Sequence, residues 1–278
     1  QSFGSAGQLL SETYQWSGRN SSIEIISGGR VLVGADTVDI AGLPTKKGTF
    51  LRASASVSIS SQRNADGVGI ELYAGGGIST HNNSGTIILD SAGDIDLQGP
   101  VVSGGLISLV QDPAGATIGY NVTRQAGTAT LQITSDARIR TGQEVYASQF
   151  ITMDAGIDST TPGDQYSGIG IVILGSSTAR TGSANSFIRL ASQSGISILA
   201  SATPTADTWN LRAADSGSSI ELLLKDNSHS TSRLQIDGRI IADDVITISA
   251  TADSGVTSDA NIGASGELKS LSNSGQIN

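Results

Sequence analysis

Apolar and polar residues alternate in short runs along this chain, and the runs end at small or polar residues. The stretch Gly85–Leu109, GTIILDSAGDIDLQGPVVSGGLISL, contains the pattern twice and begins it a third time at Ile107. Alternation with a period of two is typical of a β-strand with one buried face, and the Gly, Ser, Asp and Asn clusters between runs indicate corners. The pattern therefore predicts many short strands and no long helix.

The phrase apolar-x-apolar recurs throughout the chain. Its copies begin at Ile23, Phe50, Ile70, Ile87, Ile107, Leu131, Ile151, Ile171, Ile188, Trp209 and Leu234. The spacing is most regular in the middle, where Leu131, Ile151 and Ile171 lie 20 residues apart, while spacings of 17 and 24 occur elsewhere. A recurring unit of this size is typical of a solenoid. We predict about 20 residues per coil and roughly eleven coils.

Short strands with no helices between them cannot bury an apolar face unless they stack. In a parallel β-helix each strand pairs with its copy one coil on, about 4.8 Å away, so eleven coils predict a rod on the order of 50 Å long. The alternatives are a β-sandwich or a propeller. A sandwich of antiparallel hairpins favours Asn-Gly or Asp-Gly turns, for which Asp66-Gly67 and Asp237-Gly238 are the candidates.

No linker divides the chain, so we expect one all-β domain over residues 1–278. Residues 1–20 and 252–278 keep less of the alternation and are expected to form less regular ends. The chain begins without Met and closes in mid-pattern, so we expect it to be a fragment of a longer protein.

The amino-acid composition excludes several functional classes of protein. The chain has 35 Gly, 4% aromatic residues, no Cys and a formal net charge of −9. The absence of Cys excludes disulfides and cysteine metal sites. The acidic balance, without a run of Lys or Arg, argues against nucleic-acid or anionic-membrane partners, and no apolar run is long enough to predict a membrane span.

The chain resembles the repeat regions of filamentous haemagglutinin-like exoproteins of bacterial two-partner secretion. The resemblance covers about residues 21–278 and lies in the Gly-corner, Ile-strand cadence of SSIEIISGGRVLVGADTVDIAG, GTIILDSAGDIDLQGPVVSGGLISL and GELKSLSNSGQIN. It implies a right-handed parallel β-helix, export through an outer-membrane β-barrel partner, and display as a secreted or cell-surface fibre for adhesion, virulence or biofilm attachment. The amino-terminal secretion domain of the family is not identified in this sequence.

Carboxylates are the first candidates for chemistry. Asp94 and Asp96 flank Ile95, so both point outward if Ile95 points inward, roughly 7 Å apart as in some glycosidase pairs. The alternative is that they are ordinary solvated strand residues. Asp154 and Asp158 could contribute to a Ca²⁺ site or could be turn residues, and the nine-residue array of calcium-dependent β-rolls is absent.

Other side chains provide little for catalysis. His81 and His229 lie in separate polar loops, and no Gly-x-Ser-x-Gly motif occurs. We therefore predict no catalytic, cofactor-binding or metal-ligating residues. The scarce aromatics include Tyr146 and Tyr166, which lie 20 residues apart and are candidates for an exposed stripe that contacts a glycan. The alternative is that they line the interior or cap an end.

Two functional hypotheses remain. The first is a non-enzymatic fibre segment, an adhesin or a rigid stalk, whose partner is a host or bacterial surface glycan or a protein receptor. The second is a polysaccharide-acting β-helix enzyme or a tailspike-like glycan-binding protein, with a cleft built from polar loops such as residues 42–48, 61–67 and 224–233.

Overall fold

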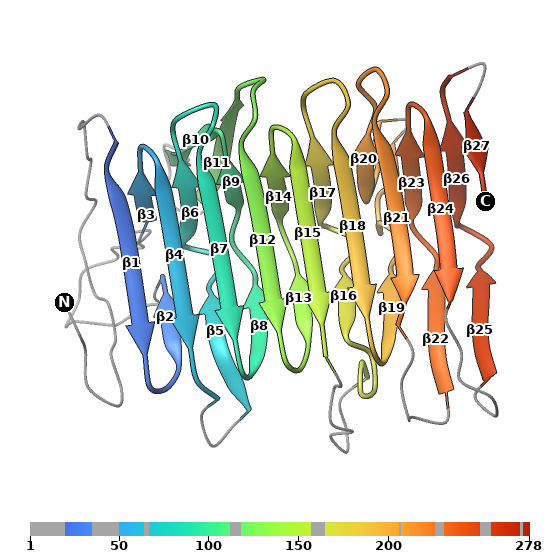
Figure 1. Cartoon of the computed structure of the whole chain (residues 1–278), viewed down its shortest axis with the longest axis horizontal. Coiled ribbons are helices and arrows are strands. Elements are labelled where there is room, and N and C mark those ends of the chain that lie inside the picture. The colour runs from blue at the N-terminus through green and yellow to red at the C-terminus, as the bar shows by residue number, and fades with distance from the viewer. Residues whose placement is uncertain are drawn as a thin grey trace.

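The computed structural model describes residues 20–34, 50–63, 67–111, 118–156, 165–205, 207–225, 231–250, 257–272 and 275–278. Within these ranges the chain is a parallel β-helix whose coils each contribute one strand to each of three long sheets. Figure 1 shows the front strands running downward and the chain returning upward behind them while it advances to the right, which is a right-handed coil. No helix in these ranges is both long and apolar enough to cross a membrane.

Each sheet is built from strands one coil apart. Sheet 1 contains β1 (Ser22–Ser27), β4 (Ser56–Ser61), β7 (Thr86–Ser91), β12 (Thr130–Ser135), β15 (Phe150–Ala155), β18 (Phe187–Ser192), β21 (Ser219–Leu224), β24 (Val245–Ala250) and β27 (Gln276–Ile277). Sheet 2 contains β2 (Val31–Val33), β5 (Val68–Leu72), β8 (Asp94–Leu97), β13 (Ile139–Thr141), β16 (Ile171–Ile173), β19 (Gly195–Ile198), β22 (Thr231–Ile236) and β25 (Thr257–Ile262). Sheet 3 contains β3 (Phe50–Ala53), β6 (Gly77–Thr80), β9 (Val101–Ser103), β14 (Glu144–Ala147), β17 (Thr178–Thr181), β20 (Leu211–Ala213), β23 (Arg239–Ala242) and β26 (Glu267–Ser270).

The predicted coil length and coil number are wrong. Paired residues of successive sheet 1 strands differ in number by 34, 30, 44, 20, 37, 32, 26 and 31, so only one pair of coils has the predicted spacing. The described strands make eight complete coils and the start of a ninth. Leu131 does pair with Ile151, but Ile171 lies in sheet 2 and pairs with Ile139 and Ile196. The apolar-x-apolar pattern occurs on strands of all three sheets within one coil. The spacing between its copies is therefore shorter than the number of residues in a coil.

Aliphatic side chains stack along the interior, as the alternation predicts. In sheet 1 the inward ladder runs through Ile23, Val57, Ile87, Leu131, Ile151, Ile188, Ile220 and Ile246, each paired with the next. All of these except Ile23 are buried. Because each buried aliphatic side chain contributes about 1.5–3 kcal/mol, this ladder is a large part of the stabilisation that short strands need.

Serines at the ends of sheet 1 strands shape the corner into sheet 2. The hydroxyls of Ser27, Ser91 and Ser135 each accept a hydrogen bond from the backbone N–H two residues on, at 3.2, 3.0 and 3.0 Å. These serines are buried, and such local bonds satisfy backbone groups that leave the sheet ladder at a turn. The Ser-rich corners in the sequence are therefore structural.

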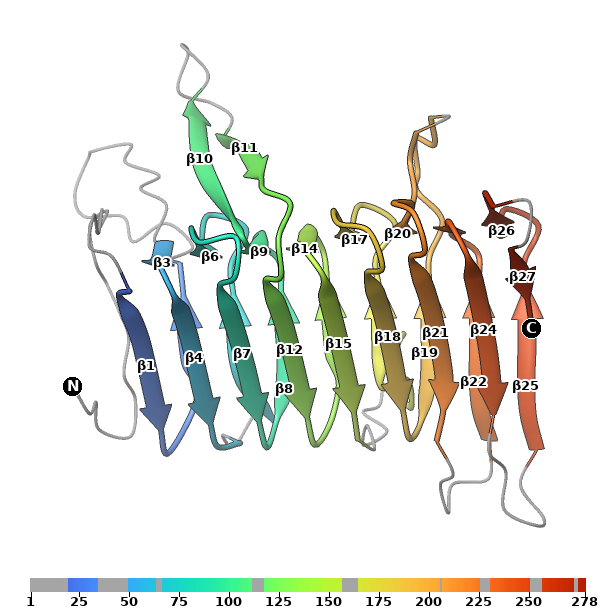
Figure 2. The same ribbon diagram turned by 45° about the horizontal axis from the view of Figure 1, so that its top comes forward.

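One hairpin departs from the coil. Strands β10 (Gly105–Gln111) and β11 (Ile118–Arg124) pair antiparallel to each other and belong to none of the three sheets. Figure 2 shows them projecting from the side of the rod that carries sheet 3. The phrase that begins at Ile107 is therefore not a coil of the solenoid, contrary to the prediction. These are the only antiparallel strands among the described residues, which argues against the sandwich.

The described part of the carboxyl-terminal segment continues the coil. Strand β25 pairs with β22 over six residues, and β26 pairs with β23 over four. Residues 1–19 lie outside the described part of the chain.

Candidate functional site

The two tyrosines proposed as a glycan-binding stripe do not share an exposed surface. Tyr146 has 1% of its surface exposed, and its ladder partners are Val102 and Arg180. Tyr166 is half-buried in the turn that precedes β16. The expectation of a shared exposed stripe is wrong because Tyr146 is covered, and Tyr146 does not line the interior either, since it belongs to a separate buried cluster. Glycan contact through Tyr166 stays a prediction.

Tyr146 is covered by the hairpin. Phe50, Val102, Ile107 and Tyr146 form a second buried cluster on the outer face of sheet 3, with Val122 of β11 packed against it. The Tyr146 hydroxyl donates to the carbonyl of Gln125 at 2.9 Å, and burial is the main reason that the tyrosine pKa is raised. The hairpin is therefore fixed against sheet 3 by packing and by a partly buried hydrogen bond at the end of β11.

Asp94 and Asp96 point outward, as predicted, and both are ion-paired. The burial pattern of β8 alternates, with Ile95 inside and both carboxylates partly exposed. Arg138 of the next coil pairs with Asp94 at 3.1 Å, and Arg140 pairs with Asp96. These contacts neutralise two adjacent carboxylates along the rod, which is a structural use of the pair.

The remaining candidates from the sequence are dispersed. Asp154 is paired with Lys225 at 2.5 Å, and Asp158 lies outside the described residues. His81 is an exposed corner residue, and His229 is also outside the described part. Among the described residues no three His, Cys, Asp or Glu side chains gather in a metal-binding arrangement.

A pocket of about 260 Å³ lies on the outer face of sheet 3, beside the hairpin. It is lined by Arg124, Gln143, Glu144, Ser176, Thr178, Arg180, Asp207, Trp209 and Arg212, which come from β11, β14, β17 and β20 and from their flanking segments. Figure 2 shows the hairpin and the segment between β19 and β20 projecting from the same side of the rod. The pocket thus lies between two excursions from the regular coil.

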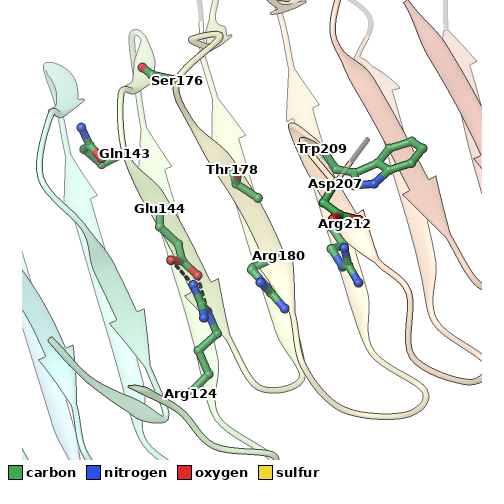
Figure 3. Close-up of a pocket in the computed structure, with 9 residues that line it drawn as sticks. All are labelled: Arg124, Gln143, Glu144, Ser176, Thr178, Arg180, Asp207, Trp209 and Arg212. Atoms are coloured by element: carbon green, nitrogen blue, oxygen red, sulfur yellow. Dashed lines mark hydrogen bonds and ion pairs between the residues drawn. The ribbon is translucent and has the colours of Figure 1, made fainter. Parts of the chain in front are cut away.

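Arg124 and Glu144 form a paired edge of this pocket. The Arg124 Nε donates to Glu144 Oε1 at 2.5 Å, and a second guanidinium nitrogen bonds the other carboxylate oxygen. Figure 3 shows this bidentate contact. Hydrogen bonding to Glu144 is the main reason that the Arg124 pKa is raised. A carboxylate held in this way is already satisfied and neutralised.

Arg180 and Arg212 are the unpaired cations of the pocket. They are direct ladder partners on β17 and β20, and Figure 3 shows their side chains extending from neighbouring strands. Neither side chain makes a hydrogen bond or ion pair with any residue that the structure describes. The Arg180 Nε is buried without a hydrogen-bond partner. Burial, and then the positive charge of Arg124, lowers the Arg180 pKa, with Arg212 contributing less.

Trp209 and Asp207 complete the pocket. Trp209 is 5% exposed, and the Arg239 guanidinium lies 4.1 Å from the centroid of its ring. Asp207 is exposed. The pocket therefore combines two unpaired guanidiniums and a single exposed carboxylate, and it is bordered by a nearly buried tryptophan.

The sequence contains a pattern that could have predicted the pairing of these two arginines. An alignment with a 20-residue period does not show it. Arg180 and Arg212 each follow an inward apolar residue, in Thr-Ala-Arg-Thr and Asn-Leu-Arg-Ala, and they lie 32 residues apart, which is the length of their coil. Alignment on that coil length would have placed the two arginines side by side.

Comparison with family models, with curated proteins and with solved structures found no match in any of the three searches.

Proposed function

We propose that this chain is a non-enzymatic segment of a bacterial fibre, secreted or displayed on the cell surface, that acts as an adhesin or as a rigid stalk. The observation that carries the proposal is the unbroken stack of coils in three parallel sheets. Nine strands in sheet 1, at about 4.8 Å each, make a rod on the order of 40 Å long with every strand but the end ones paired on both sides. Such a stack is suited to holding a binding surface at a distance.

Several outward charged side chains form ion pairs between neighbouring coils, which supports a structural role for these side chains. Arg140 with Asp96, Arg189 with Glu221, and Arg239 with Glu267 are all ladder partners that form ion pairs between neighbouring coils. A single exposed pair contributes little, but a series along the rod favours the correct register of one coil on the next.

The pocket on sheet 3 favours binding over cleavage. General acid-base catalysis of glycoside cleavage uses two carboxyl groups that flank the scissile bond. In this pocket Glu144 is held by Arg124, which leaves Asp207 as the other carboxylate. A receptor glycan or a protein side chain is therefore the ligand class we propose for this surface. Export through an outer-membrane β-barrel partner, and a role in virulence or in biofilm attachment, remain proposals that rest on the resemblance.

One paired assay tests the proposal. The purified chain is incubated with a panel of bacterial and host polysaccharides, and both retention and newly formed reducing or unsaturated ends are measured. Small-angle scattering on the same sample is expected to show a rod. Retention without new ends identifies an adhesive segment, and no retention with rod-like scattering identifies a stalk. New ends would contradict the proposal and favour the polysaccharide-acting enzyme.

A further inference from the structure

We infer that Arg180 and Arg212 form a binding site for the carboxylate of an acidic saccharide, a uronate residue of a surface or matrix polysaccharide. The inference deepens the proposed function, on which it rests, by assigning a ligand class to the pocket on sheet 3. It is carried by the pattern of charge partners along the rod.

At three other positions on the rod, the ladder provides a carboxylate for an outward arginine, whereas Arg52, whose ladder partner is Ser79, donates to the Ile107 carbonyl of the hairpin instead. Arg140 faces Asp96, Arg189 faces Glu221 and Arg239 faces Glu267, in each case directly across one coil. The fork of a guanidinium matches the two oxygens of a carboxylate, so these pairs are also geometrically specific.

At Arg180 the ladder provides no carboxylate. Its partners are Tyr146 on one side and Arg212 on the other, and the partner of Arg212 on its far side is Ile241. Two like charges on adjacent strands are unfavourable unless an anion lies between them or beside them. The Glu144 carboxylate near them is already held by Arg124.

Partial burial of Arg180 makes a bound anion more favourable at this arginine pair. Buried Nε atoms without a hydrogen-bond partner also occur at Arg30, Arg52 and Arg189, but Arg30 and Arg189 each have a carboxylate in an ion pair. Arg180 has none, and burial together with the positive charge of Arg124 lowers its pKa. A buried donor without a partner costs free energy, and a bound carboxylate oxygen would remove that cost. The chain as a whole carries a net charge of −9, so general attraction of anions does not account for a site here.

The other walls of the pocket fit a sugar. Ser176, Thr178 and Gln143 provide hydroxyl and amide groups, and Trp209, which is 5% exposed and lies under the Arg239 guanidinium, borders the pocket. A volume of about 260 Å³ lies just below the usual range for small-molecule sites, so the pocket suits a single sugar ring rather than a protein segment. The arrangement of hydroxyl and amide groups beside two cations is therefore suited to one charged sugar of a longer chain.

The test measures binding of hexagalacturonate by isothermal titration calorimetry. Its methyl ester, which has the same sugars without the charge, is the matched ligand control. A hexasaccharide that carries sulfate groups and no carboxylates tests whether sulfate can replace carboxylate. We expect the unmodified chain to bind hexagalacturonate and to bind the other two at least roughly tenfold more weakly.

Variants assign the binding to the pocket. Arg180→Gln and Arg212→Gln are each expected to weaken hexagalacturonate binding roughly tenfold or more, since each removes one charge-assisted contact. Arg189→Gln, at an ion-paired and similarly exposed arginine on sheet 1, is the matched control and is expected to bind as the unmodified chain does. Asp207→Asn removes a negative charge from the pocket and is expected to bind at least as tightly. Circular dichroism melting checks that each variant is folded.

Three results would overturn the inference: no binding of hexagalacturonate, equally tight binding of the methyl ester or the sulfated ligand, or unchanged affinity in both folded pocket variants. Failure here is distinguishable from failure of the proposed function. A chain that ignores uronates but is retained by another glycan without cleaving it remains an adhesive segment, whereas new sugar ends would reject that function whatever the pocket binds.

Discussion

At the scale of single residues, the face on which a side chain lies decides its role. Ile87 and Ile88 are neighbours on β7, but Ile87 is fully buried in the interior ladder while Ile88 has 36% of its surface exposed. The same residue type therefore contributes to the core at one position and covers the outside of the rod at the next. This alternation was predictable from the sequence, because a period of two assigns faces without any knowledge of the coil length.

We predict that Ile87→Ala lowers the free energy of unfolding by about 2–5 kcal/mol, because it leaves a cavity in a packed ladder between Val57 and Leu131. Ile88→Ala is the matched control and is expected to change stability by about 0.5 kcal/mol or less. Urea denaturation followed by circular dichroism measures both. Equal effects of the two substitutions would show that β7 does not present Ile87 to the interior.

Charge partners were not predictable at this scale. The outward direction of Asp96 follows from the alternation, but its partner Arg140 lies 44 residues further along the chain. The pairing can therefore be predicted only from the coil length, and the spacing of the repeated apolar-x-apolar pattern gives the wrong coil length. The same limit hid the pocket, since Arg180 and Arg212 become neighbours only when the 32-residue coil between them is known.

At the scale of elements, the hairpin β10–β11 is the main departure from the repeat. Its sequence alternates like a coil strand, so the pattern alone placed Ile107 in the stack. Alternation specifies a two-faced strand but not which surface will cover its apolar face. Here the apolar face packs on Phe50, Val102 and Tyr146, on the outside of sheet 3. The hairpin thereby places Arg124 at the edge of the pocket.

We predict that Ile107→Ala loosens the hairpin while leaving the rod folded. Ile107 is fully buried in the outer cluster, and its loss removes packing that holds β10 to sheet 3. Amide hydrogen exchange is expected to become roughly tenfold faster or more in β10 and β11, with the sheet 1 strands unchanged. Leu106→Ala, at an adjacent residue that is 36% exposed, is the control and is expected to leave exchange unchanged. Equal protection in both variants would mean that the cluster does not hold the hairpin.

At the scale of the whole molecule, the coil is the unit of construction. Each coil contacts its neighbours through all three sheets, and coils of different length pair in the same register because the variation lies outside the strands. In a solenoid, stability is approximately a sum over units and the interfaces between them. Removal of one entire coil should therefore preserve the architecture, whereas removal of part of a coil should not.

We predict that deletion of residues 188–219 yields a shorter, folded rod that has lost the anion site. The deletion joins Phe187 to Ile220, and because Ile188 and Ile220 are ladder partners, every later strand keeps its register. It removes Trp209 and Arg212 and leaves Arg180 beside Ile241. Circular dichroism is expected to retain the β-sheet spectrum, and calorimetry is expected to show hexagalacturonate binding weakened at least as much as by Arg212→Gln.

Two further deletions separate the register from the site. Deletion of residues 220–245 also removes one coil, since Ile220 pairs with Ile246. It keeps Arg180 and Arg212 adjacent but removes Arg239, which lies over Trp209, so folding is expected to persist and binding to weaken less than in the 188–219 deletion. Deletion of residues 188–203 removes only part of a coil and shifts the following strands out of register, so it is expected to unfold or aggregate. If the partial deletion folded as well as the two complete ones, the stacking of whole coils would not be what specifies this structure. If both complete deletions lost binding alike, the adjacent arginine pair would not be sufficient for the site.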